Sequence, residues 1–393
     1  MHTHDFVAHA RPTAVRPSRA DARLPPPHRT GAAMSSSARH GTRHKSRHDG
    51  SHGSSTQRLR SVSQRRLARR SALGVAAAAV IGGATMAAAD AAPADGPKAT
   101  DAPQAVAPYL YNGWGDTPDP ATVMDATGVK WFTLAFVLSS GACDPQWDGS
   151  RPLTGGVDAK TVDTIRAKGG DVIPSFGGAS GSKLEQSCQD ASALAGAYQK
   201  VIDAYDLKAI DIDIEGDAYN DPEVQQKAID ALKQVKADNA GLATYVTFPS
   251  AQDGPDDSMI KRAADSGLEV DGWTIMPFDF GDAGDQDMGE LTKKAAEGLK
   301  NTVKDAYGYS DDEAYRHSGV SSMNGITDVN ERVTPENFEA IRDYAQEHHL
   351  ARLTYWSANR DRPCPGAYPN DDTCSGVDQE PWQFAKIFAG YTG

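Results

Sequence analysis

The sequence predicts a TIM-type (β/α)8 barrel over residues 108–393, and two observations predict it. Eight short apolar runs alternate with amphipathic stretches, and strands that are separated by helices pair in parallel. The runs are also apolar at consecutive positions, as strands buried on both faces are. An open, doubly wound sheet is the alternative, but no glycine-rich phosphate-binding turn follows the first run.

The individual elements follow from the local pattern. Strands are expected at residues 108–114, 130–138, 171–178, 208–216, 242–250, 271–280, 319–326 and 351–358, which are rich in β-branched and aromatic residues. Helices are expected at residues 158–170, 192–207, 221–239, 289–308, 334–350 and 379–391, where apolar residues recur every three or four positions. Thr334 and Pro335 mark the start of the helix between strands seven and eight. That connection has room for one helix and for no large insertion.

The first 91 residues differ from the rest in charge, with 15 Lys and Arg against 4 Asp and Glu, whereas the remainder has 25 against 49. Residues 1–64 lack apolar periodicity and are expected to be a disordered basic extension, with Met34 or a later codon as an alternative start. Residues 65–91 combine four arginines, an apolar stretch and Ala-Asp-Ala, the pattern of an export signal for the Sec or twin-arginine route.

The export signal predicts a secreted protein, with a Pro- and Ala-rich linker at residues 92–107 before the barrel. A membrane anchor is the alternative, but Gly and Ala make the apolar stretch too weak for stable membrane insertion. The acidic mature part is unsuited to nucleic acid and suits a neutral partner. We expect it to act as a monomer.

All four cysteines lie in the exported part, where disulfides form. Cys143 and Cys188 follow strands two and three, so their loops are expected at the same end of the barrel. Cys364 and Cys374 bracket one turn-rich loop after strand eight. These positions favour the pairs Cys143–Cys188 and Cys364–Cys374 over the two other pairings. A metal site is not indicated, because no two of the cysteines are spaced as metal-ligand pairs are.

Three acidic residues alternate within the fourth strand, at Asp211, Asp213 and Glu215. Because successive strand residues point to opposite faces, the three carboxylates share one face and three isoleucines share the other. The acid row is therefore expected inside the barrel, running to its carboxyl end, where barrel enzymes hold their active sites. Burial and neighbouring charge raise the pKa of the last acid, so Glu215 is expected to donate a proton to a glycosidic oxygen.

Two other interpretations of the acid row are weaker. An exposed edge strand tolerates alternating acids, but the opposite face is apolar throughout. A Mg²⁺ site would use carboxylate oxygens, but only Asp279 offers a further acid at another strand end. We therefore expect neither a metal nor a cofactor.

Four motifs in the same order resemble glycoside hydrolase family 18. The stretch Lys208–Glu215 matches the last three acids of the family pattern Asp-x-x-Asp-x-Asp-x-Glu. The stretch Ser175–Gly178 is similar to its Ser-x-Gly-Gly, and Met276–Asp279 to its Met-x-Tyr-Asp. Trp356 stands where the family places the tryptophan beneath a sugar ring. The resemblance covers residues 108–393, as a single compact catalytic domain.

The resemblance implies a retaining, substrate-assisted chitinase that acts on β-1,4-linked N-acetylglucosamine. Glu215 would protonate the leaving oxygen while the N-acetyl carbonyl of the substrate attacks the anomeric carbon. Asp213 would orient the acetamido group, with Asp211 sharing its proton from below and Asp279 hydrogen-bonding nearby. The further residues expected at the substrate are Trp356, Met276, Phe278, Tyr111, Trp114 and Ser175.

Two positions depart from the family pattern. Lys208 replaces the first acid, low on the strand, and Phe278 replaces a tyrosine whose hydroxyl helps to hold the acetamido oxygen. Two other functions therefore stay open: an endo-β-N-acetylglucosaminidase that cleaves N-glycans, and a non-catalytic sugar-binding barrel. The short connection between strands seven and eight indicates an open groove and internal cutting of chitin chains.

Overall fold

The computed structural model describes residues 103–113, 115–369 and 372–393. The expected basic extension, the export signal, most of the linker and Trp114 lie outside these residues.

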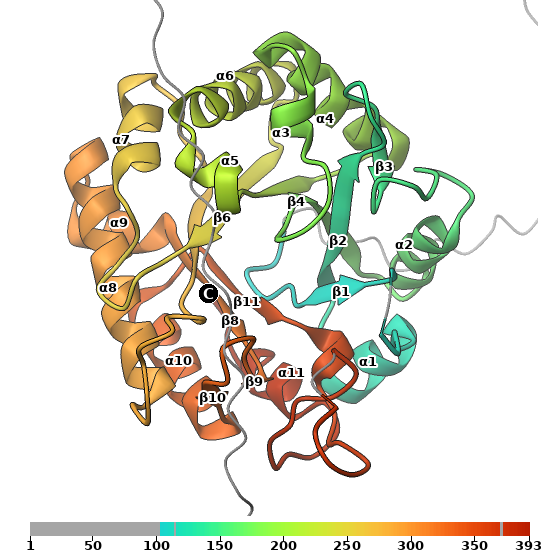
Figure 1. The fold of residues 1–393 in the computed structure, drawn as a ribbon, viewed down its shortest axis with the longest axis vertical. Helices are drawn as coiled ribbons and strands as arrows, with labels where there is room; N and C mark the ends of the chain where they lie inside the picture. Colours follow the sequence, from blue (N-terminus) through green and yellow to red (C-terminus); the bar gives the residue numbers. More distant parts are fainter. Residues whose placement is uncertain (1–102, 114, 370–371) are drawn as a thin grey trace, which may run out of the picture. The chain divides into compact units, whose positions relative to one another are not determined.

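Eight parallel strands curl into a barrel (Figure 1), in the order β1-β2-β4-β5-β6-β7-β8-β11, and a ninth strand of the same sheet, β3 Pro145–Trp147, pairs antiparallel with β2. Their bounds are β1 Tyr109–Tyr111, β2 Trp131–Ser139, β4 Asp171–Gly177, β5 Ala209–Asp213, β6 Ala243–Pro249, β7 Gly272–Met276, β8 Ser318–Met323 and β11 Arg352–Trp356. A parallel bridge between Val106 and Leu353 joins the segment before β1 to β11 and closes the ring. The predicted (β/α)8 barrel is confirmed.

Helices surround the sheet on its outer side (Figure 1). The longer ones are α1 Pro120–Thr127, α2 Val157–Ala167, α4 Ala191–Tyr205, α6 Pro222–Asp238, α7 Ser258–Asp265, α8 Met288–Tyr307 and α10 Pro335–His348. Short turns of helix are α3 Leu184–Ser187, α5 Gly216–Asn220, α9 Asp311–Arg316, η1 Ala358–Arg360 and α11 Gln383–Phe388. Helices α1 and α7 were not predicted, because each has only eight residues and so gives few turns over which apolar periodicity can be recognised. None of the helices in the described part of the chain is long and apolar enough to cross a bilayer.

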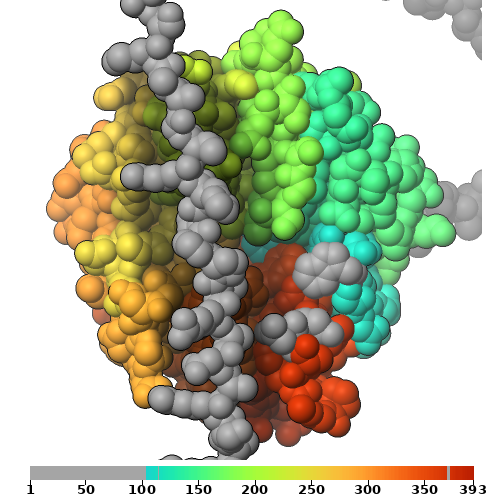
Figure 2. All heavy atoms as spheres, in the orientation of Figure 1, coloured from blue at the N-terminus to red at the C-terminus, as the bar shows by residue number. Residues whose placement is uncertain are grey.

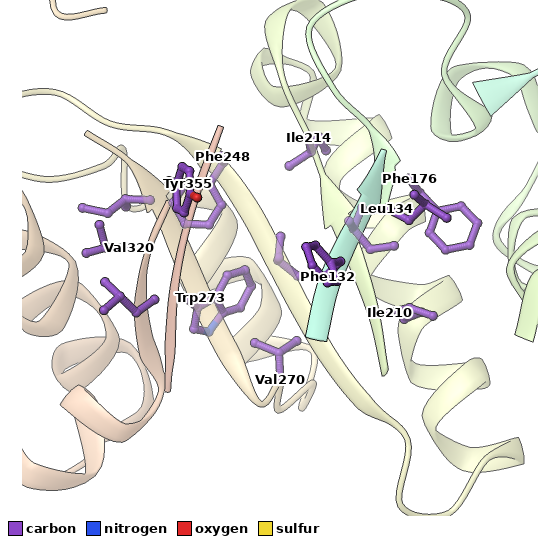
Figure 3. Packing of buried hydrophobic residues seen from close by; sticks show 14 of the residues in the cluster. Phe132, Leu134, Phe176, Ile210, Ile214, Phe248, Val270, Trp273, Val320 and Tyr355 are labelled. Atoms are coloured by element: carbon purple, nitrogen blue, oxygen red, sulfur yellow. The ribbon is translucent and has the colours of Figure 1, made fainter. Parts of the chain in front are cut away.

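The main apolar core lies between the barrel and its helices. Ile210 and Ile214, which alternate with the acids, belong to this cluster together with residues of the outer helices. Figure 3 labels both, with Phe176 of the adjacent strand β4 and Leu134 of β2 among the other members of the cluster. Because these isoleucines occupy the outer face of β5, Asp211 and Asp213 point into the barrel, as predicted.

The connection between β8 and β11 contains more than the single helix that we expected. Strand β8 ends at Met323, and the chain then forms a hairpin of β9 Gly325–Ile326 and β10 Arg332–Val333 before α10 begins. The expected strand at 319–326 is thus two separate strands in two sheets. Helix α10 starts where predicted, because Thr334 and Asn337 form a reciprocal capping box. The connection holds no inserted domain, as expected.

Both predicted disulfides, Cys143–Cys188 and Cys364–Cys374, are confirmed. The first links the segment after β2 to the end of α3. The second closes a loop of the C-terminal segment, which lies beside the residues that follow β1 (red and cyan in Figure 2). An ion pair of 2.9 Å between Arg362 and Asp116 joins these two segments.

Candidate active site

A cavity of about 340 Å³ opens at the carboxyl ends of the strands. Its lining combines aromatic rings with carboxyl groups, which come from several strands and from the loops that follow them. The lining residues are Tyr109, Tyr111, Phe136, Leu138, Asp148, Ala179, Ser180, Asp213, Glu215, Met276, Phe278, Asp279, Ser321, Met323, Asp328, Trp356 and Asp372. Apolar walls with a few convergent acids are typical of a small-molecule or sugar site.

The lowest acid of the row, Asp211, is fully buried and surrounded by donors. Its Oδ1 accepts hydrogen bonds from Thr247 Oγ1 at 2.7 Å and from Arg352 Nη1 at 2.6 Å. Its Oδ2 accepts hydrogen bonds from Ser175 Oγ at 2.7 Å and from Tyr109 Oη at 2.9 Å. Four donors, one of them the Arg352 guanidinium, thus surround this carboxyl group and fix it in one orientation beneath the cavity.

The middle acid, Asp213, lies in the cavity wall with one oxygen unsatisfied. Its Oδ2 is 3.5 Å from Tyr109 Oη, and its Oδ1 is buried without a hydrogen-bond partner among the described residues. Burial, and then the charges of Glu215 and Asp211, raise the pKa of Asp213 well above its usual value. An unpaired buried acceptor carries a free-energy cost that a donor on a bound ligand would remove.

The glycines of the Ser-x-Gly-Gly stretch explain how β4 approaches Asp213. Gly177 has φ +110°, and a Cβ at this position would lie 2.0 Å from the carbonyl oxygen of Asp213. Gly178 N donates to the same carbonyl at 2.9 Å. Because only glycine permits this conformation and this close approach, these residues set the position of the Asp213 backbone.

The last acid, Glu215, lies just beyond β5, where extended backbone leads into α5. Burial raises the pKa of the Glu215 carboxyl from its usual 4.5 to about 7. The Lys183 ammonium opposes this shift, and the carboxylates of Asp279 and Asp328 add to it. Glu215 is therefore an acid that keeps its proton at mildly acidic pH in a cavity open to ligand, as a proton donor requires.

Aromatic rings form one wall of the cavity. Trp356, at the end of β11, stacks on Phe136 of β2 with ring centroids 5.6 Å apart and an interplanar angle of 9°. Tyr109 and Tyr111 of β1 each lie 5.9 Å from the Trp356 ring. The indole Nε1 donates to Asp372 Oδ2 at 3.3 Å, which orients the ring. Such a flat, fixed ring is suited to stacking on a sugar.

The other expected substrate contacts divide into two groups. Met276, Phe278 and Asp279, at the end of β7, line the cavity with Tyr111 and Trp356. Ser175 does not line the cavity, because it is fully buried and its hydroxyl donates a hydrogen bond to Asp211. We therefore correct its assignment from substrate contact to support of that carboxylate.

The replacement at Lys208 has no bearing on the cavity. The side chain is exposed near the amino end of β5 and lies 3.6 Å from Asp206. The described residues contain no cluster of three or more His, Cys, Asp or Glu side chains that could hold a metal ion.

Several residues at or beneath the cavity were not predicted from the sequence. Arg352 and Tyr109 support the acid row from below, and their signal was present: Tyr109 stands two residues, and Arg352 four residues, before an aromatic residue of the same strand that lines the cavity, so each shares a strand face with that residue. Lys183, Asp328 and Asp372 come from irregular loops. Lys183 Nζ donates to Ser180 O at 2.6 Å and to Gly178 O, which holds the cavity loop after β4. No periodicity marks such residues.

No protein-family model matches this chain, but curated proteins and solved structures are similar to it. The probable bifunctional chitinase/lysozyme of Escherichia coli is 29% identical over 308 residues, which are 73% of this chain and 34% of that protein. Endochitinase 11 of Metarhizium anisopliae is 27% identical over 274 residues, 65% of this chain and 52% of that protein. The chain thus spans only a third to a half of the curated relatives.

The catalytic domain of a hyperthermophilic chitinase from Pyrococcus furiosus is similar over its whole length. Its crystal structure superposes with a TM-score of 0.67 and 32% identity, covering 76% of this chain and 100% of that domain. The shared barrel, the acid row on β5 and the motifs on β4, β7 and β11 agree with this likeness. The chain belongs to glycoside hydrolase family 18, among its chitinase-like enzymes.

Proposed function

We propose that this enzyme hydrolyses β-1,4-linked N-acetylglucosamine polymers, chitin above all, by a retaining, substrate-assisted mechanism. One observation carries the proposal: Glu215, with its raised pKa, shares the cavity with Asp213, whose buried Oδ1 lacks a partner among the described residues. The relatives support the substrate class, since both curated proteins are named chitinases. Catalytic-site mutants of the Pyrococcus domain are described in complex with chito-oligosaccharides.

In the proposed reaction Glu215 donates its proton to the leaving glycosidic oxygen, and the acetamido oxygen of the substrate attacks the anomeric carbon. Asp213 Oδ1 accepts the acetamido N–H and so aligns the attacking group. Asp211 does not line the cavity and has four donors, so we now assign it a fixed negative charge below the site rather than a shared proton. The attack of the acetamido oxygen gives a cyclic oxazolinium ion. A water molecule then opens this ring at the anomeric carbon, and the Glu215 carboxylate takes the proton of that water.

The replacement of a tyrosine by Phe278 leaves acid catalysis intact but removes one donor to the acetamido oxygen. Incubating the purified protein with chitin oligomers and with a high-mannose glycoprotein tests the proposal. Release of short N-acetylglucosamine oligomers supports it. Cleavage of the glycoprotein alone would assign the enzyme to N-glycans, and binding without cleavage would make it a sugar-binding barrel.

We also propose that the enzyme is secreted and acts outside the cell. The two disulfides among the described residues support this, because disulfides persist in oxidising compartments. Recovery of the processed protein from the culture medium tests the proposal, and retention of the full-length chain inside the cell would contradict it.

The pH dependence of kcat/KM should report the ionisation of Glu215. Only the protonated acid donates, so kcat/KM should be level below the raised pKa of about 7 and fall about tenfold per pH unit above it. Asp328→Asn removes a negative charge near Glu215, so the donor should lose its proton at lower pH and the falling limb should move down. Initial rates on a fluorogenic chitin oligomer measure both profiles. A limb centred near pH 4.5, or one that the variant leaves in place, would contradict this prediction.

Soluble chitin derivatives should be cut internally. Between β8 and β11 the chain forms only the β9–β10 hairpin and α10, so no added domain walls the groove into a tunnel. A chain can then bind through its middle and is not held after cleavage. Viscosity should fall early, before short products accumulate. Viscosity that stays high while dimer accumulates would show a closed groove.

A further inference from the structure

The turn of the β9–β10 hairpin and the loop after β7 hold each other through a buried carboxylate. Glu331 is only 5% exposed, and its Oε2 accepts Asp279 N at 2.8 Å while its Oε1 accepts Gly281 N at 3.1 Å. In return, Asp279 Oδ1 accepts Val329 N at 3.3 Å. Both oxygens of Glu331 are thus used to hold one loop, and that loop carries a cavity residue.

The backbone of Asp279 requires such support. Its φ of 56° lies in the left-handed region, which non-glycine residues rarely adopt and which costs on the order of 1 kcal/mol or more. A hydrogen bond from its own N–H to a buried carboxylate is charge-assisted and offsets that cost. The same conformation places the Asp279 side chain in the cavity lining.

The hairpin that carries Glu331 is itself fixed to the barrel. Ile326 N donates to Ser375 O at 2.8 Å, and the buried Arg360 donates to Asn324 O at 3.1 Å and to Ile326 O. A Cβ at Gly325 would lie 2.0 Å from Ser375 O, so the two segments are in close backbone contact. Within the turn, Glu331 N donates to Thr327 Oγ1 at 3.2 Å. Glu331 therefore projects from a rigid support.

We propose that Glu331 is a positioning residue for the reaction: its carboxylate fixes Asp279, and the turn that carries Asp328, against the proton donor Glu215. Both aspartates line the cavity, and each reaches it from a segment that Glu331 joins to the other. This inference rests on the proposed function, since its catalytic consequence requires Glu215 to act as the acid. The clamp itself, by which we mean the two hydrogen bonds from Asp279 N and Gly281 N to the Glu331 carboxylate, does not depend on the proposed function.

A first experiment tests the clamp without using activity. Glu331→Gln keeps the shape of the side chain but leaves a single acceptor oxygen, so one of the two N–H groups of Asp279 and Gly281 loses its partner. Amide hydrogen exchange of peptides covering residues 276–284 should become faster. The control is Glu339→Gln, the same change at an exposed position of α10. Exchange that is equal in wild type and Glu331→Gln would overturn the inference.

A second experiment tests the consequence for catalysis on a chitin oligomer. We expect Glu331→Gln to lower kcat about tenfold with little change in KM, because alignment at the reacting sugar is lost while the aromatic wall remains. In an Asp279→Asn background the same change should have little further effect, because Glu331 acts through Asp279. If the reductions in kcat caused by the two changes multiply in the double variant, the inference is overturned. It is also overturned if Glu331→Gln lowers kcat only to the extent that it lowers Tm and the folded fraction. If wild type is inactive, the proposed function fails and the exchange experiment still decides the clamp.

Discussion

Replacing Glu215 by Gln should reduce hydrolysis of chitin oligomers by about 10²–10⁴-fold, the usual contribution of a positioned general acid. The amide has the shape of the carboxyl group but cannot supply the proton that the leaving oxygen needs. Oligosaccharide binding should persist, since the aromatic wall around Trp356 is unchanged, as is Asp213 Oδ1, which has no hydrogen-bond partner in the described part of the chain. Initial rates give the loss of activity, and calorimetric titration with a chitin oligomer gives the affinity.

The matched control for this variant is Glu223→Gln, which makes the same change at an exposed position in the first turn of α6. It should retain full activity. If Glu215→Gln keeps more than a tenth of the wild-type rate, another group donates the proton and our assignment of the acid is wrong. If neither wild type nor variant hydrolyses but both bind, the barrel is a sugar-binding protein.

The acid row could be predicted because its signal is local. Alternation of Asp211, Asp213 and Glu215 with isoleucines fixes which face each group takes, whatever the rest of the chain does. The barrel was likewise predictable from the regular succession of apolar runs and helical stretches. The exception is informative, since Ser175 was placed at the substrate from its motif alone. In the structure its hydroxyl donates a hydrogen bond to Asp211, its register partner on the adjacent strand β5, and no spacing within β4 indicates that contact.

The supports of the site could not be predicted, because they depend on pairs that are far apart in the sequence. Arg352 meets Asp211 across 141 positions, and Glu331 meets the backbone of Asp279 across 52. The hairpin strands β9 and β10 have two residues each, too few for any period to appear. Such contacts follow from barrel closure and from loop packing, and they are defined only once the strands are in register.

Breaking the ion pair beneath the cavity should destabilise the fold strongly. Arg352 Nη1 lies 2.6 Å from Asp211 Oδ1, and both side chains are almost completely buried. Nη2 donates to Thr133 Oγ1 at 2.8 Å, and the guanidinium lies 4.8 Å from the ring of Tyr245. Its removal would leave Asp211 as a buried charge with only hydroxyl donors, which costs far more than the pair contributes over an apolar core.

We therefore expect Arg352→Met to lower the free energy of unfolding by about 3–5 kcal/mol, as breaking one side of a buried ion pair does. Equilibrium denaturation in urea measures the loss. Adding Asp211→Asn should recover part of it, because the uncompensated charge is then gone; a double variant that is less stable than Arg352→Met would argue against this explanation. A loss below about 1 kcal/mol, which is typical of an exposed ion pair, would contradict the expected cost of leaving Asp211 buried without Arg352.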